Sequence, residues 1–523
     1  MSPVSVGTAA TDLRRPAARS QPSGTRAMLA EPAVLAVAAV TVLAAVLRFY
    51  RIDHQGFWFD EGNTALLVHF SPGKMLGLIP QTESTPPLYY CVAWVWARVF
   101  GYGEAGLRSL SAVCGVLTVP VAYAAGARLI SRRAGLIAAA LTACSPLLIW
   151  YSQEARSYEM LVFLSSVSLL AFAHAHATPT PRLLAAWVIA SALALATHYY
   201  AILVVVPSAA WLLWTYRTRR SVQVGVGVVG LCGLALIPLA IGQSGTGNAS
   251  WIANAPLGRR LGQVVPQFAA GFDGPAHSVL EPLAIAILVL AAGLVFFRSD
   301  GAARRGALIA GGIALAGLVL NLLLIAGGVD DLITRNALAI WTAAALFVAG
   351  GLAAARARRV GLVAAVVLCA LGVATALGVA FDRGLERPDW RVVARALGTR
   401  AGAQGTRAIL VQHYRDLLPL SLYEPGLHFM AGAGATVSEL DVVSFTSPPS
   451  AGFCWWGSAC NLWPSQAQSS YPVAGFREVS RRRELQFTVV RLVAPHPVRL
   501  TPADVSRALT STRLANDGLL IQR

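Results

Sequence analysis

The chain has 523 residues, of which 56% are hydrophobic and only 13% are charged. Soluble domains carry about 25% charged residues, so this composition indicates a membrane protein. The formal net charge of +17 does not indicate nucleic-acid binding, because the basic residues fall in clusters between alternate apolar runs. By the positive-inside rule these clusters and the N-terminus are cytoplasmic; they are Arg14-Arg15, Arg132-Arg133, Arg217 to Arg220, Arg304-Arg305 and Arg356 to Arg359.

Residues 1–27 are rich in Ala, Pro, Ser, Thr and Arg, and this composition predicts a disordered cytoplasmic tail. The apolar run that follows lacks a small-residue cleavage site and is interpreted as a retained span. With the basic loops as anchors, residues 28–381 form a transmembrane domain of about eleven helices. The predicted spans are approximately 29–49, 107–129, 134–151, 158–176, 182–199, 201–216, 222–242, 280–297, 306–328, 337–355 and 360–380.

Two long loops, 50–106 and 243–279, are predicted on the outer face. Residues 86–100 are apolar and aromatic but short, and a crossing there would move every later basic loop outside. We therefore expect a helix that lies on the outer leaflet. Most acidic residues of the membrane portion also fall at outer ends: Asp53, Asp60, Glu61, Glu83, Glu104, Glu154, Glu159, Asp273, Glu281, Asp330 and Asp331. This distribution predicts an outward-facing polar site.

Residues 382–523 change in composition and contain no further span. A helix is predicted from Pro388, with Pro at an early helical position. Residues 408–411 and 487–493 are typical of buried strands, and Thr501-Pro502 opens another helix. An odd number of spans places this α/β domain of about 140 residues outside the membrane.

Five of the seven cysteines lie in or beside apolar runs and are interpreted as small hydrophobic residues. Cys454 and Cys460 instead lie in a polar, turn-like segment on the oxidising side. No further Cys or His ligands cluster nearby, so a disulfide is predicted in preference to a metal site.

The first candidate site is the pair Asp60-Glu61, between aromatic residues directly after the first span. Carboxylates near lipid are costly, so they indicate a functional site. The alternative is structural: Asp60 would cap a helix over residues 63–69.

Two further groups lie in predicted outer connections. Glu83 precedes the double proline Pro86-Pro87 and could contact a sugar hydroxyl. Gln153, Glu154, Arg156 and Tyr158 crowd a tight connection between two spans, where Glu154 and Arg156 could also form a structural ion pair.

The last two groups are His198-Tyr199 and Arg335-Asn336. A histidine at a membrane interface is more often a hydrogen-bonded structural residue than a catalyst. An outer arginine opposes the positive-inside bias, so Arg335 requires an anion. Asp330, Asp331 or a lipid phosphate could supply it.

In this order, the motifs resemble those of the GT-C membrane glycosyltransferases, particularly glycosyltransferase family 39, with its protein O-mannosyltransferases and lipid A aminoarabinose transferases. The resemblance covers about residues 35–400. It rests on Trp58-Phe59-Asp60-Glu61, Pro86-Pro87-Leu88-Tyr89-Tyr90, Gln153-Glu154-Ala155-Arg156-Ser157-Tyr158, His198-Tyr199, Arg335-Asn336 and Arg387-Pro388-Asp389-Trp390-Arg391.

The resemblance implies a multi-pass plasma-membrane enzyme with an extracytoplasmic active site. Asp60, with Glu61 beside it, would be the catalytic base, and Arg335 would hold the phosphate of a polyprenyl-phosphate sugar. Many relatives have His where this chain has Thr85, so no metal ligand is assigned, and a divalent metal stays open.

The implied reaction transfers mannose, or another pentose or hexose, to a hydroxyl of a glycan, lipid or protein. One base and one phosphate clamp suit a single inverting displacement. Retention would need a second carboxylate about 5 Å away, for which Glu61 and Glu154 are candidates. The sequence has no Gly-rich nucleotide motif, as expected for a lipid donor.

Two other classes remain as alternatives. A lipid-linked sugar transporter or flippase should show charges and broken helices at mid-membrane, whereas these spans are nearly free of charge. A polysaccharide ligase fits the Asp60-Glu61 pair less well. The sugar, the acceptor, the oligomeric state and the role of the C-terminal domain are not fixed by the sequence.

Overall fold

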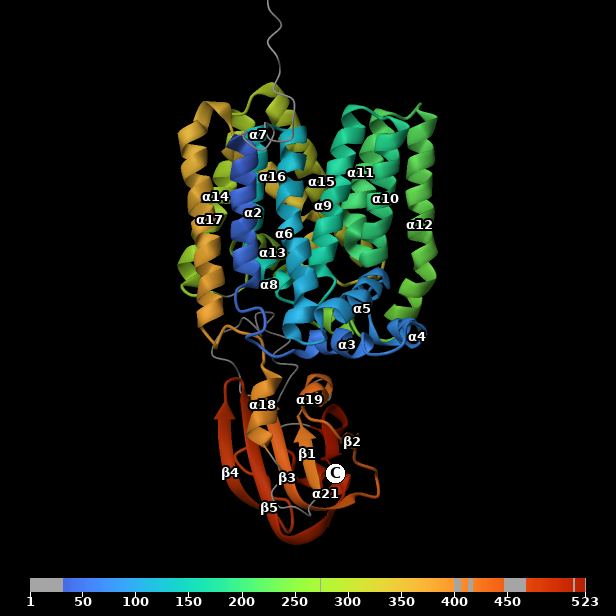
Figure 1. Ribbon diagram of the computed structural model, residues 1–523, viewed down its shortest axis with the longest axis vertical. Coiled ribbons are helices and arrows are strands. Elements are labelled where there is room, and N and C mark those ends of the chain that lie inside the picture. Colours follow the sequence, from blue (N-terminus) through green and yellow to red (C-terminus); the bar gives the residue numbers. More distant parts are fainter. Residues whose placement is uncertain are drawn as a thin grey trace, which may run out of the picture.

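The structure is a computed structural model that describes residues 32–272, 274–398, 406–412, 417–445, 467–510 and 513–522. A bundle of long helices stands on a smaller sheet domain formed by the C-terminal residues (Figure 1). The predicted tail over residues 1–27 and the cysteines Cys454 and Cys460 lie outside the described residues.

Each predicted span coincides with a helix of the bundle. The helices are α2 (Pro32–Phe49), α6 (Glu104–Leu129), α7 (Arg132–Cys144), α8 (Pro146–Ser152), α9 (Tyr158–Ala177), α10 (Pro181–Thr197), α11 (Ile202–Thr215), α12 (Arg220–Ser244), α14 (His277–Phe297), α15 (Gly301–Ala326), α16 (Trp341–Leu352) and α17 (Arg358–Phe381). Short 3-10 turns accompany them: η1 (Tyr199–Ala201), η2 (Ser250–Asn254), η3 (Thr334–Ile340) and η4 (Ala355–Ala357).

The number of helices able to cross a bilayer is smaller than eleven by length and composition. Within the described part of the chain, eight qualify, or nine if α7 and α8 form one bent span. The difference comes from α10 and α11, with 17 and 14 residues. At about 1.5 Å per residue, both fall short of a hydrocarbon core about 30 Å thick, although they stand alongside the longer helices in the bundle (Figure 1).

The bend between α7 and α8 measures 55° and has a clear cause. Pro146 cannot donate a backbone hydrogen bond, so the helix breaks at Ser145. The guanidinium of Arg48, fully buried on α2, donates to the carbonyl oxygens of Thr142 and Ala143 at 2.8 and 3.0 Å. These bonds satisfy carbonyl groups that the break leaves without helical partners.

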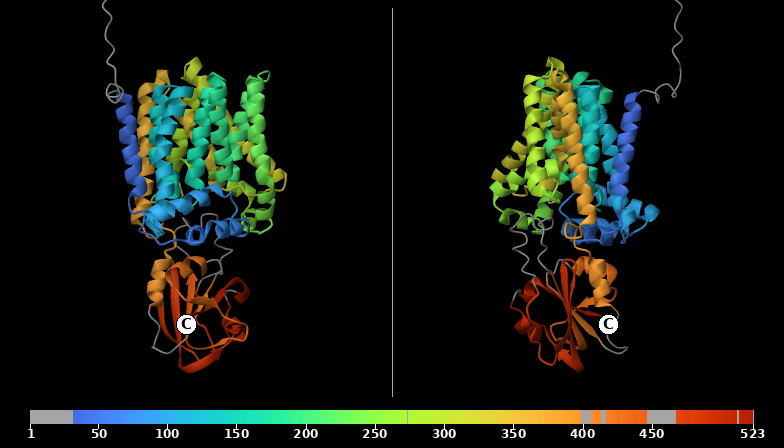
Figure 2. Two further views of the ribbon diagram at one scale, coloured as in Figure 1. Left: turned by 45° about the vertical axis from the view of Figure 1, so that its right-hand side comes forward. Right: turned by 90° about the vertical axis from the view of Figure 1, so that its left-hand side faces the viewer.

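Short helices lie across the end of the bundle that faces the C-terminal domain (Figures 1 and 2). They are α3 (Phe59–Leu67), α4 (Pro72–Thr82) and α5 (Leu88–Phe100). The predicted surface helix over residues 86–100 corresponds to α5, which at 13 residues is too short to be a candidate span. The second long loop folds into α13 (Leu257–Ala270). The chain enters the bundle at the opposite end from the C-terminal domain (Figure 2).

The C-terminal domain is built on a six-stranded mixed sheet of order β2-β6-β1-β3-β5-β4. Its strands are β1 (Arg407–Val411), β2 (Leu427–Phe429), β3 (Ala435–Phe445), β4 (Arg477–Glu484), β5 (Phe487–Leu500) and β6 (Gly518–Gln522). Helices α18 (Trp390–Leu397) and α19 (Leu417–Tyr423) share a core with one face, and α21 (Pro502–Ala508) with the other. A last turn, η6 (Leu514–Asn516), precedes β6. The predicted helix near Pro388 begins at Trp390 with Asp389 as its cap, so Pro388 precedes the helix.

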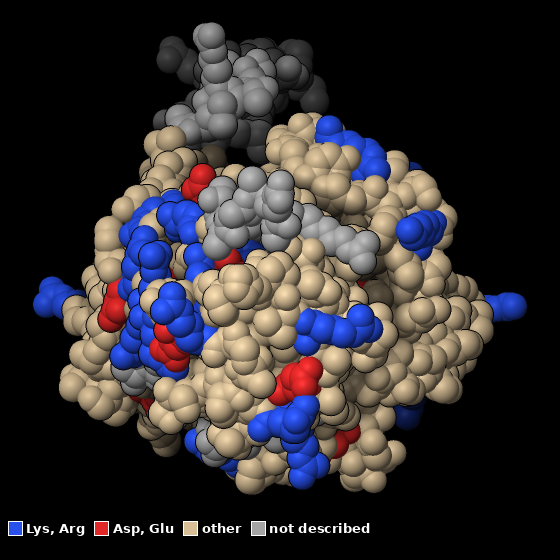
Figure 3. Space-filling view, turned by 90° about the horizontal axis from the view of Figure 1, so that it is seen from below, with Lys and Arg blue, Asp and Glu red and all other residues tan. Residues whose placement is uncertain are grey.

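The edge strand β4 is highly exposed and carries four arginines and two glutamates. Seen from the end that carries the C-terminal domain, basic side chains are interspersed with acidic ones (Figure 3). Charged side chains on an edge strand discourage pairing with another chain, which accounts for the composition of β4.

Candidate active site

The centre of the site is an ion pair between α3 and η3. Nη1 of Arg335 lies 2.6 Å from Oδ2 of Asp60, and both side chains are about one-seventh exposed, at 15% and 14%. The guanidinium carbon of Arg335 also lies 5.6 Å from the ring centroid of Tyr158. Helix α3 begins at Phe59, so Asp60 belongs to its first turn and is not its N-cap. The alternative of Asp60 as a helix cap is therefore wrong.

Glu61 has a different environment from that of its neighbour Asp60. It is fully buried, and Arg108 of α6 donates to both of its oxygens, at 2.7 and 2.5 Å. The backbone N–H of Ala155 donates to Oε1 at 2.8 Å, and that of Trp58 to Oε2 at 3.4 Å. Both oxygens are occupied, so Glu61 ties the start of α3 to the bundle.

Glu83 pairs with Arg156, at 2.8 Å between Oε2 and Nη1. The hydroxyl of Tyr90 donates to the same oxygen at 2.6 Å. Burial raises the pKa of Glu83 above its ordinary value, and Arg156 opposes the shift. Its Oε1 is buried without a hydrogen-bond partner in the described part of the chain. The alternative of a structural ion pair between Glu154 and Arg156 is wrong, because Arg156 pairs with Glu83.

Glu154 pairs instead with Arg387, from the segment that leads into the C-terminal domain, at 3.1 Å. Arg387 also donates to the carbonyl oxygens of Trp150 and Gln153 at 2.8 and 3.2 Å. Burial raises the pKa of Glu154 to about 7; the positive charge of Arg387 opposes the shift, and the negative charge of Asp60 adds to it. Glu154 thus lies within electrostatic reach of the central ion pair.

The other predicted site residues surround this centre. The ring of His198 lies 5.8 Å from that of Tyr158, and its Nδ1 accepts from the N–H of Tyr200 at 3.2 Å. Tyr199 donates to Gln243 at 2.7 Å, and this contact ties it to a neighbouring helix.

Asn336 and Gln153 make contacts with the backbone. The Asn336 side chain donates to the carbonyl of Asp331 at 2.7 Å, and that of Gln153 to the carbonyls of Arg48 and Tyr50 at 3.2 and 2.9 Å. The Asn336 side chain thus fixes the segment that precedes Arg335, and that of Gln153 fixes the end of α2 and the residue after it.

The acidic residues expected as alternatives for Arg335 lie elsewhere. Asp330 accepts from Arg260 of α13 at 2.7 and 2.9 Å, and this bidentate pair fixes the second long loop. Of the described acidic residues, Asp60 is the one that forms a salt bridge with Arg335.

Two residues that shape the site were missed as candidates, Arg108 and Arg387. Arg108 lies close to the start of a predicted span, and a charge inside an apolar segment itself indicates a buried partner. Arg387 belongs to one of the sequence motifs, but its position beside Glu154 depends on a contact between residues 233 positions apart. Sequence spacing carries no signal for such a contact.

Among the residues that the structure describes, no three His, Cys, Asp or Glu side chains are grouped so that they could hold a metal ion. The carboxylates of the site are each paired with an arginine instead.

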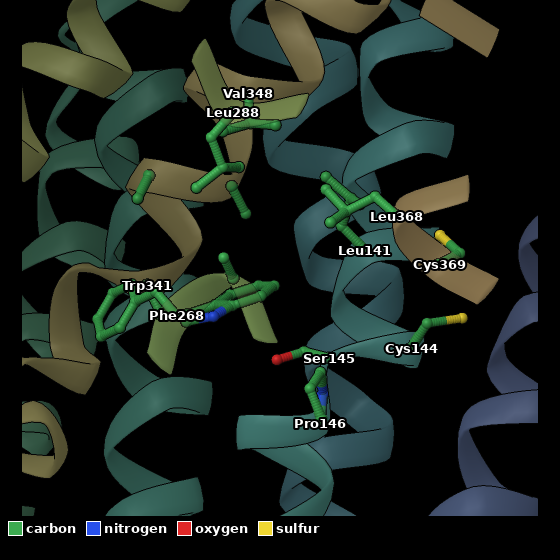
Figure 4. A pocket seen from close by; sticks show the side chains of 13 residues that line it. Leu141, Cys144, Ser145, Pro146, Phe268, Leu288, Trp341, Val348, Leu368 and Cys369 are labelled. Atoms are coloured by element: carbon green, nitrogen blue, oxygen red, sulfur yellow. The ribbon is translucent and has the colours of Figure 1, made fainter. Parts of the chain in front are cut away.

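A pocket opens beside the break between α7 and α8 (Figure 4). Its lining is almost wholly apolar and comes from α7, α8, α13, α14, α16 and α17: Leu141, Cys144, Ser145, Pro146, Phe268, Ala269, Leu288, Trp341, Ala344, Ala345, Val348, Leu368 and Cys369. Trp341 directly follows η3, which carries Arg335, and α8 leads into the loop of Glu154. Two helices that line the pocket, α8 and α16, are therefore adjacent in the chain to segments that carry residues of the charged site.

Comparisons with known proteins agree with this architecture. Residues 84–241 match the family model described as dolichyl-phosphate-mannose-protein mannosyltransferase. No curated protein matches the chain in sequence. The fold is similar to that of ArnT from Cupriavidus metallidurans in two crystal structures. The apo form has 14% identity and a TM-score of 0.55, and the form bound to undecaprenyl phosphate has 16% and 0.52. Each covers 88% of this chain and 97% of ArnT.

Over residues 84–241 the chain thus resembles the dolichyl-phosphate-mannose-protein mannosyltransferases. Its bundle of apolar helices joined to a small sheet domain is a fold similar to that of ArnT.

Proposed function

We propose that the protein transfers a sugar, mannose or another pentose or hexose, from a polyprenyl-phosphate donor to a hydroxyl group of a glycan, lipid or protein. The supporting observation is the Asp60–Arg335 pair. It is the one arginine–carboxylate pair of the site in which both partners are appreciably exposed, at 14% and 15%. The carboxylates of the other three pairs, Glu61, Glu83 and Glu154, are at most 1% exposed.

The chemistry divides between these two side chains. An acceptor hydroxyl oxygen attacks the anomeric carbon, and the bond from that carbon to the phosphate oxygen breaks with its electron pair. The leaving lipid phosphate stays ionised and needs a positive group, which Arg335 provides. The hydroxyl proton passes to the carboxylate of Asp60, acting as general base.

A single inverting displacement fits the environments of the carboxylates best. Retention needs a second carboxylate as nucleophile. Both oxygens of Glu61 already accept hydrogen bonds, and Glu154 is paired with Arg387 and has a raised pKa. Asp60 is thus the carboxylate best suited to react, and no step is assigned to a metal ion.

Donor binding would also change the state of the base. A phosphate that binds Arg335 competes with Asp60 for the guanidinium, so the carboxylate gains freedom to accept a proton when the donor is in place. The apolar pocket beside α8 suits the isoprenoid chain of the donor. The similar fold of ArnT binds such a lipid, since one of its crystal structures is bound to undecaprenyl phosphate.

We place the site and the C-terminal domain on the extracytoplasmic side of the plasma membrane. The basic loops predicted to be cytoplasmic connect α6 to α7, α11 to α12, α14 to α15 and α16 to α17. A reporter that is active only outside the cytoplasm should be active when fused after Arg523. Activity only from a reporter that requires the cytoplasm would reverse this orientation.

The function is tested with purified protein and a panel of radiolabelled polyprenyl-phosphate sugars, with the matching nucleotide sugars as controls. Label should move from a lipid donor to acceptors in a membrane extract, and the anomeric configuration of the product should be inverted. Arg335→Ala and Asp60→Asn should abolish most transfer. Transfer from nucleotide sugars, or none from any lipid donor, would contradict the proposal.

A further inference from the structure

The C-terminal domain contacts the segment that leads into α3. Helix α19 packs on α3 so closely that a Cβ atom on Gly62 would lie 3.1 Å from the side chain of Leu418. From the end of α19, the hydroxyl of Tyr423 accepts from the N–H of Phe57 at 2.5 Å and donates to Oε1 of Glu104 at 2.7 Å. A residue of the C-terminal domain thus bridges two segments of the membrane domain, three positions before Asp60.

A second residue of the C-terminal domain contacts Gly56, which directly precedes Phe57. Oδ1 of Asp389 accepts from the N–H of Gly56 at 3.0 Å. The fit is tight, because a Cβ atom on Gly56 would lie 2.4 Å from that oxygen and 3.1 Å from the Tyr423 hydroxyl. A side chain added at Gly56 would displace the Asp389 carboxylate that accepts this hydrogen bond.

The opposite side of this turn is held by the bundle. Arg108 donates to the carbonyl oxygens of Ile52, Gln55 and Gly56 at 2.9, 2.7 and 2.9 Å. The backbone carbonyls of Ile52, Gln55 and Gly56 therefore bind the bundle. The carbonyl of His54 accepts from Arg391 of the C-terminal domain, and the N–H groups of Gly56 and Phe57 also bind that domain. With partners on both sides, the turn has little freedom to shift.

We propose that Tyr423 and Asp389 are positioning residues for the transfer reaction, through which the C-terminal domain sets the place of Asp60. The inference rests on the proposed role of Asp60 as base. Asp60 lies in the first turn of a short helix, and two N–H groups of the turn before that helix are bound by one side chain from each of two elements of the other domain. Misplacement of a reacting group by about 1 Å can lower the rate roughly 100-fold, so loss of these contacts should lower kcat.

The test compares Tyr423→Phe with Tyr471→Phe. Each removes one buried hydroxyl from the C-terminal domain, but that of Tyr471 contacts Gln412, Ser444 and Gln468 within the domain. Tyr423→Phe should lower kcat by about 10- to 100-fold and leave donor Kd near that of the wild type. It should also speed amide hydrogen exchange in the peptide that contains Phe57. Tyr471→Phe should leave both kcat and that exchange unchanged.

A second pair of variants separates positioning from folding. Asp389→Asn keeps an oxygen acceptor for the Gly56 N–H and should retain more turnover per folded molecule than Asp389→Ala. Wild-type kcat in Tyr423→Phe would overturn the inference, as would unchanged exchange at Phe57. Hydrogen exchange does not require turnover, so it tests the contact between Tyr423 and Phe57 even if the wild type transfers no sugar. Absence of transfer by the wild type would instead contradict the proposed function.

Discussion

Nη1 of Arg335 lies 2.6 Å from Oδ2 of Asp60, across 275 positions of the chain. Asp60 lies in the first turn of a short helix at the end of the bundle, and Arg335 lies in a 3-10 turn before a late helix. The pair brings a carboxylate and a guanidinium to the same place, and these are the two groups that the proposed transfer from a lipid phosphate requires.

Neutral substitutions of Asp60 and Glu61 should have different effects, one on turnover and the other on stability. Asp60→Asn should lower turnover by about 10²- to 10⁴-fold, as for loss of a general base, with a melting temperature near that of the wild type. Glu61→Gln should instead destabilise the protein by about 3–5 kcal/mol, because it leaves buried Arg108 without its counter-charge. Turnover and thermal unfolding of both variants check this. Normal turnover by Asp60→Asn would remove it from the mechanism.

Arg335→Lys keeps the charge but loses the planar guanidinium. Hydrogen bonds to charged groups contribute about 1.5–3 kcal/mol, so donor affinity should fall roughly 10- to 100-fold. Arg260→Lys is the matched control, since it disturbs the bidentate pair with Asp330 and should lower stability without weakening the donor. Equal donor Kd in Arg335→Lys and the wild type, measured with a fluorescent polyprenyl phosphate, would assign Arg335 a structural role only.

The stability of the protein should depend on pH through Glu154. Its pKa is raised from an ordinary value of 4.5 to about 7 by burial, so between these pH values the folded state holds a proton that the unfolded chain has lost. Stability then falls as pH rises from about 4.5 through 7. Glu154→Gln should flatten this part of the pH profile of the melting temperature. Parallel profiles for variant and wild type would contradict it.

Filling the apolar pocket should affect long donors more than short ones. Val348 lines the pocket, and Val348→Trp should raise KM for a donor with a long isoprenoid chain and leave that for a short-chain analogue near its wild-type value. Val360, 53% exposed on α17, provides the control Val360→Trp. A uniform change for both donors would show that the chain binds elsewhere.

The disulfide between Cys454 and Cys460 stays a prediction from their spacing in an oxidising compartment. Mass spectrometry of peptides from unreduced protein should find the two linked. Two free thiols would rule the bond out.

The class of the protein and the positions of its helices could be predicted from the sequence alone. Apolar runs separated by basic loops indicated a polytopic membrane protein, because a hydrocarbon core demands long apolar segments. Local motifs also singled out Asp60, Glu83, Glu154 and Arg335 as candidate site residues, since charge is costly near lipid.

The pairing of the arginines with the carboxylates could not be predicted from the sequence and follows from the packing of the helices. The sequence offered Glu154 as one possible partner of Arg156, and Asp330, Asp331 or a lipid phosphate as possible partners of Arg335. In the fold, Arg156 binds Glu83, and Arg335 binds Asp60. Ion pairs depend on distances of a few ångströms between segments separated by tens to hundreds of positions, and no local pattern encodes them. The same packing made Asp60 reachable and buried Glu61 against Arg108, because successive residues of a helix point about 100° apart.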